Sequence, residues 1–299
     1  MSFSSDVKNE LYGNISKARH CQIAELSAII SFGCRLRIDG NESVLELEQD
    51  NNRLQRKFFS LINKTHSFDK SESVSGHKVI EVLKTTKFID DEKLECVELD
   101  YINKLIIQQP CCKKAFIRGA FLSAGTISDP NKSYHFEIVA RTSRQAEELR
   151  EILEFFEVRA KIVRRKNHFV VYLKEGSQIV DVLNVMGAHK SLMDLENVRI
   201  VKEMRNSVNR KVNCETANIS KMINASVKQI EDIEYIEKTI GLSNLPDVLG
   251  EMANVRLEHP DTPLKELGEY LSTPSGKSGV NHRLRRISEI ADKLRNQEE

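Results

Sequence analysis

Apolar residues near the carboxyl end of the chain recur at helical spacing on both sides of a short polar break. Before the break, Leu264, Leu267 and Leu271 fall on one side of an expected helix. Thr262 is suited to cap this helix, and Pro263 to occupy its first turn. After the break, the apolar positions are Val280, Leu284, Ile287, Ala291 and Leu294. Two amphipathic helices joined by a short turn are typical of a helix-turn-helix.

The face opposite the second stripe is polar and basic. At about 100° per residue, its members are, from the centre outward, Ser278, His282, Arg285, Arg286 and Asn281. Arg can bond O6 and N7 of guanine, and Asn can bond N6 and N7 of adenine, so this helix suits a major groove. Arg283 lies beside the stripe, where it would follow the domain surface or reach the DNA backbone. A solvated amphipathic helix is the alternative.

Upstream of these two helices, apolar spacing predicts further helices of the same domain. A long helix from Ile219 ends at Gly241, and another runs from Leu245 toward Leu257. The string Asn213–Asn218 is small and polar, which indicates a linker or a helix boundary. We therefore expect a linker over residues 201–218 and a compact helical domain over residues 219–299.

The first two hundred residues contain an internal repeat. Glu25–Gly33 and Ile117–Gly125 share a helix-then-glycine pattern, and their final glycines, at positions 33 and 125, are 92 apart. Each segment precedes two short strand-like runs and then an amphipathic helix, which begins near Asn51 in one copy and near Ser143 in the other. The repeat predicts an α+β domain over residues 1–200, with copies at about 20–107 and 112–190.

The second copy continues beyond that helix. Residues 161–164 and 168–173 form an expected hairpin around 165–167, followed by a helix from about Ser177 to Met186. Both motif helices contain small residues, which are Ser27, Ala28, Gly119 and Ala120. Small side chains let two helix backbones approach closely, so we expect the two motif helices to pack together between the copies. Substitution of Arg118, within this interface, should impair folding.

This order of elements resembles the LAGLIDADG homing-endonuclease fold, in which two copies form a saddle of strands over DNA. Together with the helix-turn-helix, the whole chain resembles the WhiA family of bacterial DNA-binding regulators. The strings that carry the resemblance are Arg118–Gly125, Asp129-Pro130 with Tyr134–Glu137, Asn213–Asn218, and Gly279–Leu284. Gly276 departs from the family pattern, which usually has Ser before the lysine, so we expect Ser275 to cap the recognition helix.

The resemblance implies a two-copy LAGLIDADG-like α/β saddle followed by an all-α helix-turn-helix domain. It also bears on catalysis, because nucleases of this fold place an acidic metal ligand just before the final glycine of each motif helix. Those positions are Phe32 and Ala124 in this chain, and neither side chain can hold a metal. Asp39, Asp129 and Glu137 lie beyond the motif helices, so we do not expect them to substitute.

The implied function is a sequence-specific transcription regulator without enzymatic activity, involved in cell division and chromosome segregation, and in sporulation where the organism sporulates. Its partners would be double-stranded DNA and either another transcription regulator or RNA polymerase. The DNA-binding residues would be Ser275, Lys277, Ser278, Asn281, His282, Arg283, Arg285 and Arg286. The alternatives are a metal-dependent DNA endonuclease and an adaptor whose first domain binds a protein or small ligand.

Basic residues on the expected strands and hairpins of the saddle are candidate contacts to the DNA backbone. They are Arg35, Arg37, Arg141, Arg164, Arg165 and Lys166, with Arg159 and Lys161 beside them. Acidic runs at residues 42–48 and 90–95 lie on the same half of the chain. The tip at residues 164–166 is equally consistent with a solvated hairpin.

Composition narrows the class of protein without identifying it. The chain has 299 residues, enough for about two domains, and its 40% hydrophobic and 30% charged residues are typical of a globular protein. Because the net charge is only +1, any DNA-binding surface must be a local cluster of basic residues. Six cysteines without a CxxC pair predict neither a zinc site nor another cofactor. The absence of a signal peptide or membrane-length apolar window in the sequence predicts a cytoplasmic, nucleoid-associated protein with no membrane partner.

Overall fold

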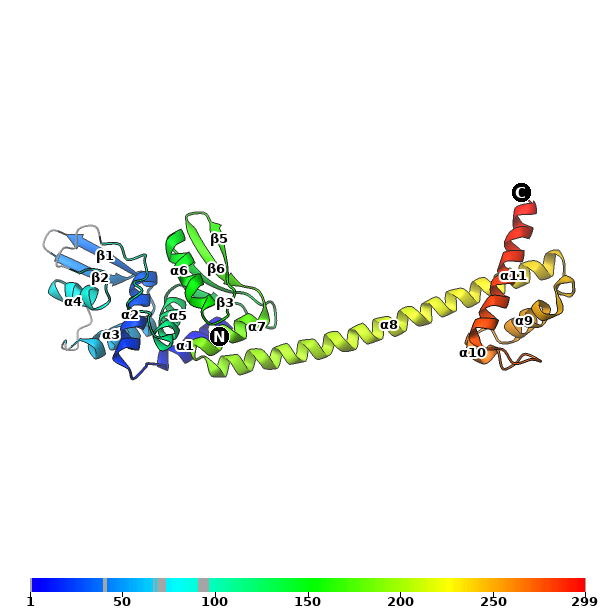
Figure 1. Cartoon of the computed structure of the whole chain (residues 1–299), viewed down its shortest axis with the longest axis horizontal. Coiled ribbons are helices and arrows are strands. Elements are labelled where there is room, and N and C mark those ends of the chain that lie inside the picture. The colour runs from blue at the N-terminus through cyan, green and yellow to red at the C-terminus, as the bar shows by residue number, and fades with distance from the viewer. Residues whose placement is uncertain (1, 40–41, 67, 69–73, 91–96, 299) are drawn as a thin grey trace. The chain divides into compact units, whose positions relative to one another are not determined.

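The computed structural model describes residues 2–39, 42–66, 68, 74–90 and 97–298, and these form two compact units (Figure 1). Unit 1 spans Met1–Glu203 and unit 2 spans Met204–Glu299. Each unit encloses its own cluster of buried apolar side chains. A separate core is the main requirement for a domain that folds by itself.

The first copy of the repeat consists of helices around one β-hairpin. α1 (Phe3–Gly13) precedes this copy, whose elements are α2 (Arg19–Gly33), β1 (Cys34–Asp39), β2 (Glu42–Leu47), α3 (Asn52–Thr65) and α4 (His77–Thr85). β1 and β2 pair antiparallel, with Cys34 opposite Leu47. The Asn51 side chain caps α3 by accepting hydrogen bonds from the backbone N–H groups of Arg53 and Leu54. The start of α3 near Asn51 is therefore as the sequence predicts.

The second copy contains a four-stranded antiparallel sheet with strand order β3-β4-β6-β5. Its elements are α5 (Pro110–Ala124), β3 (Gly125–Ile127), β4 (Phe136–Ala140), α6 (Ser143–Glu154), β5 (Lys161–Arg165), β6 (His168–Leu173) and α7 (Gly176–Met186). Thr142 caps α6 by accepting from the Gln145 N–H, and Lys166 adopts a φ of 52° in the turn between β5 and β6. The predicted hairpin and both flanking helices are confirmed.

The two motif helices, α2 and α5, pack against each other along their length, as the small residues predict. A Cβ atom placed on Gly119 would lie 2.5 Å from the Glu25 carbonyl oxygen and 2.9 Å from Cβ of Ala28. A Cβ atom on Gly33 would lie 2.9 Å from Cβ of Ser123. Such distances are shorter than van der Waals contact, so only glycine permits this approach of the two backbones.

Three buried charged side chains join α2, α3 and α5. The Arg118 Nε and Nη2 atoms donate to the two carboxylate oxygens of Glu25 at 2.9 and 2.7 Å, and Lys57 Nζ lies 2.7 Å from Glu25 Oε1. Lys57 also donates to the carbonyls of Leu11 and Asn14. Burial lowers the pKa of Lys57, and the charge of Glu25 opposes that effect. In this triad (Glu25, Lys57 and Arg118), the Glu25 carboxylate is the counter-charge that allows the Arg118 side chain to be buried.

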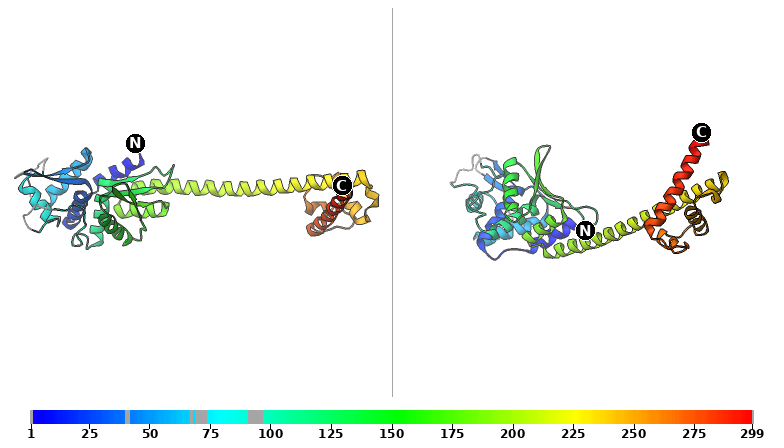
Figure 2. Two further views of the ribbon diagram at one scale, coloured as in Figure 1. Left: turned by 90° about the horizontal axis from the view of Figure 1, so that it is seen from above. Right: turned by 45° about the vertical axis from the view of Figure 1, so that its right-hand side comes forward.

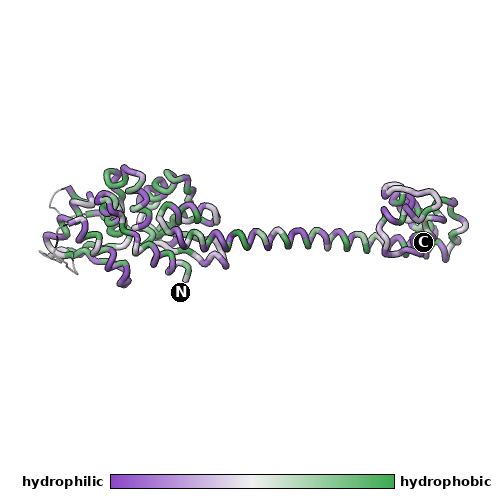
Figure 3. The backbone as a smooth tube through the Cα atoms, turned by 90° about the horizontal axis from the view of Figure 1, so that it is seen from below, coloured by the Kyte–Doolittle hydropathy of each residue, from purple (hydrophilic) through white to green (hydrophobic). Residues whose placement is uncertain are grey.

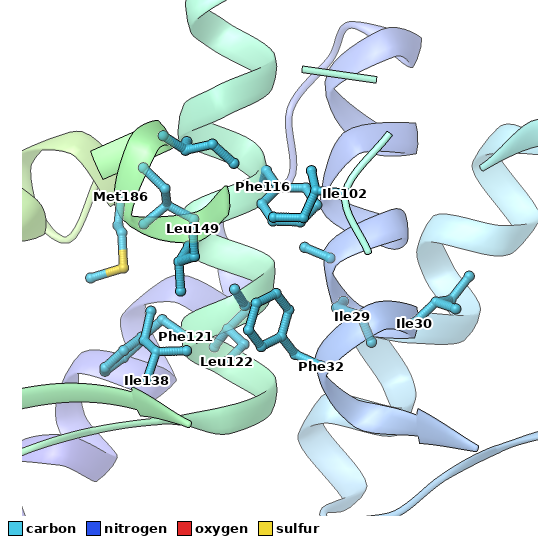
Figure 4. Close-up of a cluster of buried hydrophobic side chains, with 14 of the residues drawn as sticks. Ile29, Ile30, Phe32, Ile102, Phe116, Phe121, Leu122, Ile138, Leu149 and Met186 are labelled. Carbon is cyan, nitrogen blue, oxygen red and sulfur yellow. The ribbon is translucent and has the colours of Figure 1, made fainter. Parts of the chain in front are cut away.

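The apolar core of unit 1 includes residues of both copies and fills the space between the motif helices and the sheet of the second copy. Figure 4 shows the ring of Phe32 between α2 and α5, and that ring lies edge-on to Phe116 at 6.2 Å between centroids. Phe121 of α5 stacks on Phe136 of β4 at 5.1 Å. These contacts join the motif helices to the sheet in one continuous cluster.

The helix boundary expected at residues 213–218 is wrong, because α8 (His189–Thr239) runs through that segment without a break (Figure 2). The segment 189–239 contains no Pro or Gly, so nothing in its covalent structure ends the helix. Hydrophilic and hydrophobic residues alternate along α8 (Figure 3). Gly241, at a φ of 84°, ends the helix as predicted. Among the described residues, no helix combines the length and apolar character needed to cross a membrane.

Unit 2 is all-α. After α8 it contains a short 3₁₀ turn (Leu242–Asn244), α9 (Asp247–Glu258), α10 (Leu264–Leu267) and α11 (Lys277–Glu298). The first helix of the helix-turn-helix is shorter than the sequence predicts: Pro263, and not Thr262, is its N-cap residue, and it ends at Leu267. Leu271 lies beyond its end but is still buried, because the following turns fold it against α11.

Candidate nucleic-acid interface

One face of α11 forms part of the core of unit 2. Val280, Leu284, Ile287 and Ala291 are at most 1% exposed, and Leu294 is partly buried. They pack with α9, with the end of α8 and with Leu267 and Leu271. The predicted apolar stripe is therefore confirmed, and it fixes which side of α11 faces away from the protein.

The opposite face of α11 is exposed and carries the side chains that the sequence assigned to DNA. The exposed members are Lys277, Ser278, Asn281, His282, Arg285 and Arg286. Arg285 Nε lies 3.3 Å from Oε1 of Glu289, one turn further along the same helix. Both side chains are more than half exposed, and such i,i+4 pairs are worth only about 0.3–0.5 kcal/mol. Arg285 is therefore free to exchange this partner for another.

Arg283 differs from its neighbours, as its position beside the stripe predicts. It is half-buried and lies close enough to Glu251 of α9 for its charge to act on that carboxylate. The pKa of Glu251 is lowered first by hydrogen bonds from Ser272 and then by Arg283. Arg283 thus lies along the surface of unit 2, at the edge of the exposed face.

The turn before α11 is closed by backbone contacts. The Ser275 N–H donates to the Gly268 carbonyl at 3.0 Å, and a Cβ atom on Gly268 would lie 1.8 Å from the Ser275 carbonyl oxygen. The first hydrogen bond of α11 runs from Val280 N–H to the Gly276 carbonyl at 3.1 Å. Gly276 therefore occupies the N-cap position that the sequence assigned to Ser275, because an N-cap residue supplies the first carbonyl acceptor.

An ion pair that the sequence did not indicate holds the other end of α11. Arg295 Nη1 lies 2.8 Å from Oδ1 of Asp232, a residue of α8 that is 1% exposed. The Arg295 guanidinium also lies over the Tyr235 ring, 4.8 Å from its centroid. Together with the apolar stripe, these contacts set the direction of α11 within unit 2.

The candidate backbone-contact residues of unit 1 lie on strands and hairpins, and most are matched by carboxylates. The ion pairs are Arg35 with Glu48, Arg37 with Glu46, Arg141 with Glu48 and Arg165 with Glu137, at 3.0–3.5 Å. Arg141 also donates to the Cys34 carbonyl, so it joins the two copies. Arg164 and Lys166 are exposed, and in the described part of the chain no ion pair involves them. The acidic run at 42–48 supplies two of these carboxylates, Glu46 and Glu48, whereas residues 91–96 of the second run lie outside the described residues.

The positions that correspond to nuclease metal ligands are apolar. Phe32 is 6% exposed and packs on Phe116, and Ala124 has no donor atom. The Asp129 carboxylate accepts hydrogen bonds from the backbone and side chain of Asn131, a local turn. The side chain of Asp39 lies outside the described residues.

Glu137 is occupied by other contacts. It accepts from His135 at 2.9 Å and from Arg165 at 3.0 Å. Partial burial acts to raise the pKa of Glu137, but the His135 hydrogen bond and the Arg165 charge lower it below its usual value. The Glu137 carboxylate is therefore engaged in a surface network on its own sheet.

Known protein families match both copies of the repeat and the helix-turn-helix domain. Family profiles match for the "WhiA N-terminal LAGLIDADG-like domain" over residues 19–81, the "WhiA LAGLIDADG-like domain" over 113–205 and the "WhiA C-terminal HTH domain" over 208–291. A "Probable cell division protein WhiA" from Lachnospira eligens is 48% identical and another from Lachnoclostridium phytofermentans is 46% identical. Each alignment covers 99% of this chain, with 98% and 100% of the respective relative.

A solved structure shows the same order of domains. The crystal structure of full-length DUF199/WhiA from Thermatoga maritima is 25% identical, with a TM-score of 0.56, and the match covers 98% of this chain and 99% of that one. The predicted fold, a LAGLIDADG-like saddle followed by a helix-turn-helix domain, is thereby confirmed. The chain belongs to the WhiA family.

Proposed function

We propose that this protein is a sequence-specific DNA-binding transcription regulator that uses the exposed face of α11 to bind the major groove. The observation that carries the proposal is the division of α11 into a buried apolar stripe and an exposed face with Asn281, His282 and Arg285. A helix fixed to its domain by one side presents the other side in a constant orientation. That orientation is what readout of base edges requires.

The residues of the proposed surface have different tasks in such a complex. Arg285 suits guanine and Asn281 suits adenine, because each can make two hydrogen bonds to one base. Lys277 and Ser278, at the amino end of α11, suit a phosphate, since the free N–H groups of a helix start attract anions. Ser275, His282, Arg283 and Arg286 flank these positions and complete the proposed surface.

The process that the protein serves is proposed from its relatives. Their printed name, probable cell division protein, supports a role in cell division. We extend this to chromosome segregation, to sporulation where the organism sporulates, and to association with the nucleoid. The further partner would be another transcription regulator or RNA polymerase. In unit 1, exposed Arg164 and Lys166 would add contacts to the DNA backbone if the saddle lies on the duplex.

We propose in addition that the protein has no nuclease activity. Two-metal or one-metal hydrolysis needs carboxylates at the ends of the motif helices, and Phe32 and Ala124 occupy those ends. Plasmid that carries a bound site should therefore stay supercoiled with Mg²⁺ or Mn²⁺ in a nicking assay. Metal-dependent nicking that is lost in Asp129→Ala or Glu137→Ala would contradict the proposal and favour the endonuclease alternative.

Binding to DNA is tested by mapping bound sites across the genome and measuring affinity for the strongest site with the purified full chain. Arg285→Ala and Asn281→Ala should each weaken binding to that site by about 1–3 kcal/mol and relax discrimination at one base pair. Lys277→Ala should weaken binding to any duplex and reduce the salt slope by about 1. Lys293→Ala, an exposed cation elsewhere on α11, is the matched control and should change neither quantity.

Two outcomes would oppose this assignment. Unchanged discrimination after combined substitution of Asn281, His282 and Arg285 would show that α11 does not recognise the site. Equal affinity and footprint for residues 204–299 and for the full chain would favour the adaptor alternative for unit 1. A longer footprint of the full chain would instead support DNA contacts by the saddle.

A further inference from the structure

Four side chains with metal-binding atoms meet where the two motif helices begin. His20 and Cys21 lie in the first turn of α2, and Cys111 and Cys112 lie in the first turn of α5. Their ligand atoms all lie within 4.8 Å of one another. Nδ1 of His20 is 3.1 Å from Sγ of Cys112, 3.4 Å from Sγ of Cys21 and 4.0 Å from Sγ of Cys111.

We propose that this cluster is a structural zinc site with three thiolate ligands and one imidazole ligand. A tetrahedral ion with Zn–S bonds of about 2.3 Å and a Zn–N bond of about 2.0 Å sets S···N separations near 3.5 Å and S···S separations near 3.8 Å. The observed separations of 3.1–4.0 Å bracket the S···N value, so small side-chain adjustments bring the four atoms into place. Three sulfurs with one nitrogen is a ligand set that zinc commonly takes in structural sites.

The electrostatics of the location favour the loaded cluster. One Zn²⁺ ion with three thiolates and a neutral imidazole has a net charge of −1. Two helices begin at this point, so their free N–H groups and the positive ends of their dipoles face that charge.

The burial pattern shows how an ion could enter and remain. Cys21 and Cys112 are 4% and 3% exposed and pack with Ala24 and Ala115 in a small apolar cluster, whereas His20 and Cys111 are exposed. The buried pair would form the floor of the site, and the exposed pair would close it. Four protein ligands leave no open position, so the ion would hold the two helices together and activate no water.

This position also separates the proposed ion from nuclease chemistry. The cluster lies at the amino ends of α2 and α5, whereas Phe32 and Ala124 lie at their carboxyl ends. Each helix has 15 residues, which corresponds to about 20 Å along its axis. The zinc site would therefore stabilise the interface between the copies from the end opposite to the strands.

The test measures zinc directly in the full chain. The protein is purified without chelator, its zinc content is determined by mass spectrometry, and Co²⁺ is then substituted as a spectroscopic probe. We expect about one zinc per chain and intense visible absorption typical of tetrahedral cobalt–thiolate coordination. Cys111→Ser and His20→Ala change exposed ligands and should leave the fold intact. Each should weaken zinc binding more than about a hundredfold, since even residues that only support a metal ligand cost 10–100-fold.

Cys214→Ser is the matched control, because Cys214 is an exposed thiol on α8 far along the chain from the cluster. It should bind zinc and cobalt like the original chain. Treatment with a chelator should lower the melting temperature of the original chain and of Cys214→Ser, but not that of the two ligand variants. Equal zinc affinity in all variants, a folded chain that binds neither metal, or a disulfide between Cys21 and either Cys111 or Cys112 in rapidly alkylated cell extracts would overturn the proposal.

Discussion

Replacement of Glu25 by Ala is expected to lower the free energy of unfolding of unit 1 by about 3–5 kcal/mol, because it leaves two buried cations without a counter-charge. Lys57 is 3% exposed and Arg118 is 6% exposed, so water cannot take the place of the lost carboxylate. The loss is a large part of the stability of a typical domain, which is about 5–15 kcal/mol. Urea denaturation, followed by hydrogen exchange in peptides of α2 and α5, measures it.

Three further variants separate the buried charge from other effects. Glu147→Ala removes a partly exposed ion pair with Arg150 in the same unit and should cost no more than about 1 kcal/mol. Glu25→Gln keeps a hydrogen-bond acceptor but leaves the two cations without a counter-charge. Its loss of unfolding free energy should therefore lie between the losses in Glu147→Ala and Glu25→Ala. Joint replacement of Glu25, Lys57 and Arg118 by Leu, Met and Met should recover most of the loss. A Glu25→Ala chain as stable as Glu147→Ala would show that the triad is solvated.

Sequence patterns predicted the parts of this fold that depend on neighbours within a few residues. The stripe of α11 follows from apolar spacing, and the starts of α3 and α6 follow from Asn51 and Thr142 beside amphipathic segments. The packing of α2 on α5 was also predictable, because the small residues recur in both copies of the repeat. Once the buried apolar stripe of α11 is known, the residues on the opposite side of the helix are identified as its exposed face.

Other features depend on residues that are distant along the chain. His20 and Cys112 are 92 positions apart, so no local spacing of cysteines indicates that their side chains meet. The same holds for Glu25 with Arg118, 93 positions apart, and for Asp232 with Arg295, 63 positions apart. The motif helices place the first two pairs side by side because the repeat superimposes residues about 92 positions apart. The repeat length of 92 residues thus indicates which distant residues of the two motif helices lie side by side, whereas rules for metal sites consider only ligands that are close along the chain.

Local sequence patterns were misleading about where helices end in two places. Small polar residues at 213–218 indicated a helix boundary, but each is tolerated in a helix and only Pro or Gly would have ended α8 at once. Leu264, Leu267 and Leu271 keep helical spacing and are all packed on the core, yet the helix ends at Leu267. Apolar spacing therefore predicted which side chains are buried, whereas the helix ends just before Gly268, whose carbonyl accepts a hydrogen bond from the Ser275 N–H.

That contact gives the second large expected effect: Gly268→Ala should destabilise unit 2 by about 3 kcal/mol and abolish discrimination between specific and unrelated DNA. The added Cβ atom would lie 1.8 Å from the Ser275 carbonyl oxygen, which is a backbone atom and cannot rotate away. Relief of the clash would break the hydrogen bond from Ser275 N–H to the Gly268 carbonyl and displace the start of α11. Thermal denaturation, hydrogen exchange of residues 264–290 and binding to the mapped site would measure these effects.

Gly250→Ala is the control that distinguishes this clash from a general effect of adding a methyl group. Gly250 lies within α9 of the same unit, and its Cβ atom would lie 3.4 Å from the Leu242 carbonyl oxygen, which is ordinary contact. Alanine is favoured over glycine inside a helix by about 0.5–1 kcal/mol, so this variant should be as stable as the original or slightly more so. Gly268 also has helical backbone angles, with a φ of −67°, so helix propensity alone would predict stabilisation at both sites. Opposite signs for the two variants are therefore expected only if the close approach of Gly268 to Ser275 exists in solution, and equal signs would contradict it.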